Sequence, residues 1–130
     1  MANPVLNLAT TILAGNAGWN LSNTLTATLL TVDAEKIVKI NTIICSNVDG
    51  SAAADLNLYI DGLGSGTTGV TTTGADTTVY LAKTVGVPAD ASLIILDNPI
   101  YLMEGDVLKG GASATGDLDL FISYEVFDDA

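Results

Sequence analysis

The sequence contains no arginine and no histidine, and its only basic residues are Lys36, Lys39, Lys83 and Lys109, against 15 acidic residues. Without arginine the chain has no planar fork for a phosphate, and without histidine it has no side chain that ordinarily titrates near neutral pH. Scattered lysines cannot form the basic patch that nucleic acid requires, and the net charge of −11 repels phosphates. We therefore expect no direct nucleic-acid binding.

Cysteine and long apolar runs are also scarce. Cys45 is the single cysteine, which excludes an internal disulfide and a cysteine metal cluster, and we interpret it as a small buried hydrophobe rather than a reactive thiol. The longest apolar runs, such as LIIL at 93–96, are far shorter than the ~20 residues of a bilayer-spanning helix. The start, MANPVLNLATTILAG, lacks the basic region of a signal peptide. We expect no membrane partner, and synthesis in the cytoplasm.

The residue types that carry catalysis are missing or poorly placed. A glycosidase needs two carboxylates across a cleft, usually with aromatic platforms, and this chain has two Phe, four Tyr and one Trp. Serine and threonine are abundant, but no histidine can activate them and no G-x-S-x-G elbow is present. The acidic turns DGLGSG and TGDLD do not have the spacing of a calcium loop. We expect no enzyme activity, no catalytic residue, no metal site and no cofactor.

Apolar residues that alternate with polar ones are plentiful, and turn residues separate the alternating runs. Such a pattern predicts an all-β fold, an antiparallel β-sandwich of eight or nine short strands. The length favours one domain, with a sandwich core over 36–130 and an N-terminal segment, 1–35, that forms either an arm or the first strands. The expected strands are 5–13, 24–32, 36–48, 54–61, 78–85, 92–97, 100–103, 107–110 and a last one from Leu118.

The alternation also predicts which residues fill the core. In the run 36–48, uninterrupted alternation places Val38, Ile40, Thr42 and Ile44 on one face and Ile43 and Cys45 on the other. The clearest inward rows belong to the run 54–61 and to the last strand, and they comprise Leu56, Leu58, Ile60, Leu118, Leu120, Ile122, Tyr124 and Val126.

Some sizeable side chains have no evident place in that core. Trp19 lies between two small polar stretches and is either a core plug or an interface anchor. The Gly- and Thr-rich segment 62–78, with Val70, is either a flexible surface loop or an arm that orders on a partner. Phe121 and Phe127 face away from the inward row of the last strand, and with Tyr101 they complete the candidate interface.

An order of phrases in the chain carries a resemblance. KIVKINTIICSN is followed by ADLNLYIDG, by VYLAKTVGVPADAS and by LIILDNPIYLMEGDVLKGGASATGDLDLFISYEVF. From Lys36 to Phe127 this order resembles a class of virion proteins of tailed phages, notably phages of marine cyanobacteria and other marine bacteria. The shared phrases are turns and strands, not catalytic signatures, and the first 35 residues have no part in the resemblance.

The resemblance implies a jelly-roll-like sandwich that decorates a capsid, typically as a homotrimer. Its partners would be the major capsid protein and its own copies, and its place would be the outer capsid surface of the virion. Phe121, Phe127 and Tyr101 would then contact sister subunits. Asp119, Ser123 and Glu125 interrupt this row, so a polar or solvent-facing surface is the alternative. A neck or tail-fibre component is the nearest alternative, and a host-surface or glycan-binding module is a more distant one.

Overall fold

The computed structural model describes residues 11–64 and 70–128. Within these residues the chain forms strands and no helix, so no helix there could cross a membrane. The strands are β1 (Thr11–Asn20), β2 (Thr28–Thr31), β3 (Lys36–Asn47), β4 (Ala54–Asp61), β5 (Val79–Val87), β6 (Ser92–Leu96), β7 (Ile100–Leu102), β8 (Val107–Ala112) and β9 (Leu118–Asp128).

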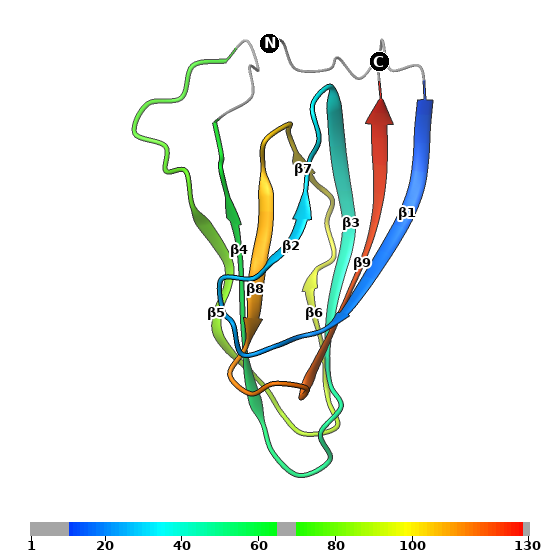
Figure 1. Cartoon of the computed structure of the whole chain (residues 1–130), viewed down its shortest axis with the longest axis vertical. Helices are drawn as coiled ribbons and strands as arrows, with labels where there is room; N and C mark the ends of the chain where they lie inside the picture. The colour runs from blue at the N-terminus through cyan, green and yellow to red at the C-terminus, as the bar shows by residue number, and fades with distance from the viewer. Residues whose placement is uncertain (1–10, 65–69, 129–130) are drawn as a thin grey trace.

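The strands form two antiparallel sheets packed as a sandwich (Figure 1). The first sheet has the order β1-β9-β3-β6, and β7 pairs with β3 on the same side as β6; the second has the order β2-β8-β4-β5. Most successive strands lie in opposite sheets, and β9 returns between β1 and β3. This is the strand order of a jelly roll, which confirms the expected all-β, jelly-roll-like sandwich.

The core lies between the two sheets and takes its side chains from the inward rows of both. Leu56, Leu58 and Ile60 of β4 are buried, as are Leu118, Leu120 and Ile122 of β9. Tyr124 and Val126, farther along β9, are half-buried against the same cluster. Cys45 is fully buried in it.

A β-bulge in β3 overturns the predicted faces of that strand. Ile40 pairs with Tyr124 and Thr42 with Ser123, so Asn41 is an extra residue without a partner in β9. The alternation restarts after it, and Ile43 and Cys45 join Val38 and Ile40 in the core. The expectation that Ile44 shares the face of Val38 is therefore wrong, because an inserted residue reverses the phase of a period-two pattern.

The N-terminal segment supplies β1 and β2, one strand to each sheet. Part of the predicted first strand, residues 5–10, lies outside the described residues, and β1 extends instead over Thr11–Asn20 through Gly15 and Gly18. Glycine and asparagine have low strand propensity, but ten consecutive pairs with β9 override it. In the segment 62–78, the described residues 62–64 and 70–78 form no strand, and 65–69 lie outside the description.

Candidate interaction surface

An apolar row crosses the outer face of the β1-β9-β3-β6 sheet. Because side chains alternate along a strand, residues on the opposite side from Leu120 point away from the core. The pairing aligns Gly18 of β1, Phe121 of β9, Ile44 of β3 and Ile94 of β6. Phe121 is 42% exposed and Ile94 66% exposed. We call these four residues the outer apolar row.

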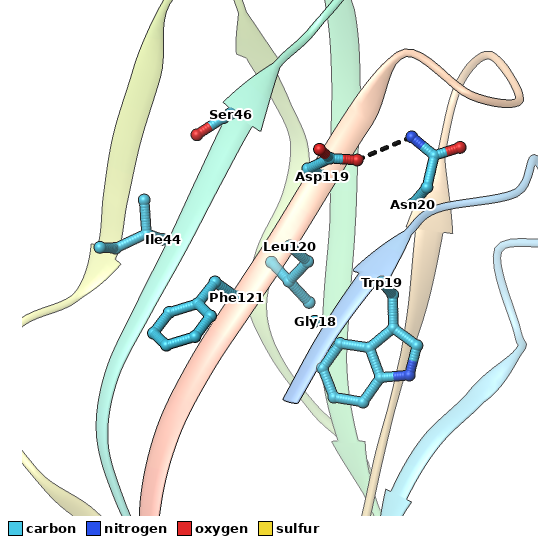
Figure 2. A pocket seen from close by; sticks show the side chains of 8 residues that line it. All are labelled: Gly18, Trp19, Asn20, Ile44, Ser46, Asp119, Leu120 and Phe121. Carbon is cyan, nitrogen blue, oxygen red and sulfur yellow. Dashed lines mark hydrogen bonds between the residues drawn. The ribbon is translucent and has the colours of Figure 1, made fainter. Parts of the chain in front are cut away.

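The row borders a hollow of about 330 Å³ (Figure 2). The hollow exists because Gly18 adds no side chain to the row. A Cβ placed on Gly18 would meet only the carbonyl oxygen of Leu120, at 3.5 Å, which is ordinary van der Waals contact. The surface could therefore hold an apolar side chain above Gly18. The lining residues come from three adjacent strands and are Gly18, Trp19, Asn20, Ile44, Ser46, Asp119, Leu120 and Phe121.

Polar groups at one end of the hollow already bind each other. Asn20 Nδ2 donates to Asp119 Oδ1 at 2.7 Å, drawn as a dashed line in Figure 2, and to the carbonyl oxygen of Gly116 at 3.1 Å. The hydroxyls of Ser46 and Ser92 share a hydrogen bond of 2.8 Å. The hollow thus has an apolar side and a polar rim whose main hydrogen bonds are internal, an arrangement typical of the centre and edge of a protein contact.

The buried thiol beneath this face is not reactive. Burial, and then the negative charge of Asp119, raise the pKa of Cys45 to about 11. A thiol with such a pKa is almost wholly protonated at neutral pH, and the thiolate is the nucleophilic form. The structure therefore agrees with a packing role for Cys45.

Two buried carboxylates lie in the turn between β7 and β8, away from the hollow. Glu104 Oε2 accepts a hydrogen bond of 2.9 Å from the backbone N–H of Glu35, and Asp106 Oδ2 accepts one of 2.8 Å from that of Met103. Asp106 Oδ1 is buried without a hydrogen-bond partner among the described residues, and burial raises the pKa of this carboxyl. The Glu104 bond holds the turn against the β2–β3 connection, where Glu35 has a φ of +65°, and the Asp106 bond closes the turn on itself. Within 11–64 and 70–128, no three acidic, histidine or cysteine side chains are grouped to hold a metal ion.

The structure brings together only two of the five candidate interface residues. Phe121 and Trp19 both line the hollow, but Trp19 pairs with Leu120 and packs partly against the core. Tyr101 is exposed on the same outer face, opposite Lys39. Phe127 is half-buried near the far end of β9, and Val70 is exposed in the β4–β5 connection.

Sequence reasoning missed Gly18, Ile44 and Ile94 as members of this surface. The alternation predicts Ile44 on the inward face of β3, because no residue type near Asn41 indicates the bulge. Ile94 lies in the continuous run LIIL, where every residue is apolar and period two has no contrast. The sequence could not indicate the role of Gly18, because a glycine leaves a hollow only where side chains of neighbouring strands surround it.

Comparison of the chain with known protein families, curated proteins and solved structures finds no match.

Proposed function

We propose that this protein is a structural virion protein of a tailed phage, a decoration protein that binds the outer surface of the capsid. The supporting observation is the outer apolar row, which presents Phe121 and Ile94 to solvent on one open sheet face. Large apolar side chains that line up over several strands are typical of protein interfaces. The resemblance of Lys36–Phe127 to phage virion proteins supplies the setting.

The charges of the described residues favour a protein partner over nucleic acid. Lys36 forms an ion pair with Asp128 and Lys109 one with Asp61, both at 3.3 Å. Lys39 lies opposite Glu125 in the β3–β9 pairing, and Lys83 lies 5.0 Å from the centre of the Tyr80 ring. The lysines are thus dispersed over both sheets, and they form no positive patch for phosphates.

The jelly-roll strand order agrees with the proposal but does not carry it. The order occurs in viral capsid domains and also in lectin domains and cupins. Function depends on the surface that a fold displays. In the proposed role, the exposed side chains of the outer apolar row contact apolar side chains of neighbouring capsid subunits. Binding only to the assembled shell would then stabilise that shell by mass action.

Addition of the purified protein to expanded capsids that lack it tests this function. We expect saturable binding, and decorated capsids should rupture at a higher temperature. Replacing Phe121 and Ile94 together by serine should weaken binding about ten-fold or more, equivalent to about 1.4 kcal/mol. Val79→Ser is a matched control. Val79 is 45% exposed, a fraction similar to the 42% of Phe121, but it lies on β5 in the other sheet. This control should change binding less than about two-fold.

Salt distinguishes the expected contact from an electrostatic one. Because the chain carries a net charge of −11, raising NaCl from about 50 mM to 500 mM should strengthen capsid binding or leave it unchanged. Binding that requires low salt would contradict an apolar contact. Absence of binding at every salt concentration, with a fixed small copy number in the tail, would instead assign the protein to the neck or fibre.

A further inference from the structure

We propose that two copies of this chain pair through their β1 edges and form one continuous sheet across a two-fold axis. The inference starts from the five strands that end the sheets or lie along their margins, which are β1, β2, β5, β6 and β7. β2 and β6 are short, and Asn98-Pro99 separates β6 from β7. β5 is long, but its pairing with β4 is irregular, it carries Lys83, and Thr84 has a φ of +53°. These features hinder edge-to-edge pairing.

β1 has none of these protections. It spans Thr11–Asn20, its pairing with β9 is regular throughout, and it contains no charged residue and no proline. Ile12 is 59% exposed and Leu13 52% exposed on this strand. A long, uncharged edge that also exposes two large apolar side chains is a template for another strand. We infer that the occupant is a second copy of the chain. Each copy has a net charge of −11, but β1 contains no charged side chain, so two β1 strands can pair without charge repulsion between them.

The hydrogen bonds identify the backbone groups that are available. Leu21, directly after β1, donates its N–H to the carbonyl of Leu118 at 2.8 Å, in continuation of the β1–β9 register. Hydrogen-bonded pairs alternate in an antiparallel ladder, so Trp19, Ala17 and the other odd-numbered residues bond to β9. The even-numbered residues from Ile12 to Asn20 turn their N–H and C=O groups away from β9. No described strand pairs with that side.

The side chains select one register. Two β1 strands related by a two-fold axis must oppose even-numbered residues to even-numbered ones. If the axis passes at Gly15, then Ile12 of the second copy lies opposite Gly18, and Leu13 of the second copy lies opposite Ala17. Ile12 would enter the hollow above Gly18 and extend the outer apolar row beside Phe121. An axis at Asn16 would instead place Ile12 opposite the polar Asn20, which leaves the hollow empty.

Analytical ultracentrifugation of the full chain, without capsids, tests the pairing and is independent of the proposed function. We expect a dimer of twice 13.3 kDa, that is 26.6 kDa. Ala14→Pro removes an N–H that points away from β9, so the monomer should fold, while the dissociation constant of the dimer should rise about 100-fold. Ile94→Ser, at the other margin of the same sheet, should leave the dimer intact. A wild-type monomer up to about 1 mM, a trimer, or a dimer that persists in Ala14→Pro overturns the proposal.

Cysteine cross-linking tests the register without relying on the proline variant. In the proposed register Ala14 lies opposite Asn16 of the second copy, and Cα atoms in such a pair are about 5.5 Å apart, within reach of a disulfide. A mixture of Ala14→Cys and Asn16→Cys chains should therefore give a mixed disulfide dimer under mild oxidation. Asn16→Cys alone should give little cross-linked product. Efficient cross-linking of Asn16→Cys alone, or none in the mixture, contradicts the Gly15 axis.

Discussion

Asn47 is a buried polar residue whose side chain ties three backbone groups together. Its Nδ2 donates to the carbonyls of Ala52 and Val87, each at 2.9 Å, and its Oδ1 accepts from the N–H of Asp49 at 2.8 Å. The bonds join the β3–β4 turn to β5 in the opposite sheet. Every strong hydrogen-bonding atom of the amide thus has a partner, which explains how the core accepts it.

Asn47→Ala should therefore destabilise the protein strongly. The change leaves buried carbonyl and N–H groups without partners, and we expect the free energy of unfolding to fall by about 2–4 kcal/mol. Asn20→Ala is the matched control. The Nδ2 of Asn20 likewise donates two hydrogen bonds, to a carbonyl and to a carboxylate, but Asn20 is exposed. The substitution should cost less than about 1 kcal/mol. Urea denaturation of both variants makes the comparison, and equal losses would contradict the importance of burial.

Asp106 predicts a pH dependence of stability with an unusual sign. Burial raises its pKa in the folded protein above the ordinary value of 3.8. Below that ordinary value the carboxyl is neutral in both states, and stability is lost as the pH rises through the folded pKa and the buried group becomes charged. Asp106→Asn does not ionise. The unfolding free energy of the variant minus that of wild type should thus increase from about pH 3 to pH 7.

Asp61→Asn provides a control of opposite sign. Hydrogen bonds from the Thr78 hydroxyl and the Gly62 N–H, followed by Lys109, lower the pKa of Asp61. Stability from this carboxylate is present above the unfolded pKa and is lost as the pH falls through the folded one. The variant-minus-wild-type difference should therefore decrease from low to neutral pH. The same slope for both variants would show that neither carboxyl acts as described.

At the scale of single elements, the bulge in β3 should be removable. Deleting Asn41 leaves Ile40 inward, Thr42 outward and Ile43 inward, which is the regular alternation that β9 already matches. We expect a loss of only about 1–2 kcal/mol, mainly from local twist and the hydrogen bond of Asn41 to Glu125.

Deleting Ile44 is the matched control for that prediction. The deletion turns Cys45 outward, moves Ser46 into the core and displaces Asn47 from its hydrogen bonds. It should prevent folding or cost more than about 4 kcal/mol, as judged by circular dichroism and urea denaturation. Similar stability of the two deletion variants would mean that Asn41 is not the extra residue of β3.

The bulge also shows why the sequence predicts elements better than faces. Alternation from Leu118 to Ile122 is a local property, and it correctly predicts that side of β9 as buried. A bulge depends on what the neighbouring strand does, and nothing near Asn41 distinguishes it from a regular strand residue. Composition alone predicts that four scattered lysines form no basic patch. Predicting the outer apolar row requires the register of four strands, which depends on residues far apart in the sequence.

For the whole molecule, the charge imbalance predicts stabilisation by salt. With 15 acidic residues and four lysines, most carboxylates have no lysine to face, and their mutual repulsion opposes the compact state. Raising NaCl from about 50 mM to 1 M should increase the free energy of unfolding by about 1 kcal/mol. Urea denaturation at both concentrations measures this increase. Near pH 4, where carboxylates begin to protonate, the salt effect should shrink, and a salt effect of the same size at both pH values would argue against charge repulsion.

The adjacency of β1 and β9 sets the order of events during synthesis of the chain. Thr11–Asn20 leaves the ribosome about 100 residues before its pairing partner Leu118–Asp128, and at ~5–20 residues per second that interval is roughly 5–20 s. Throughout this time β1 has no strand on either side, and the sheet cannot close around its core. During this interval the unpaired β1 segment of one nascent chain is accessible to chaperones and to other nascent chains. Chaperone binding or premature strand exchange would therefore begin at β1.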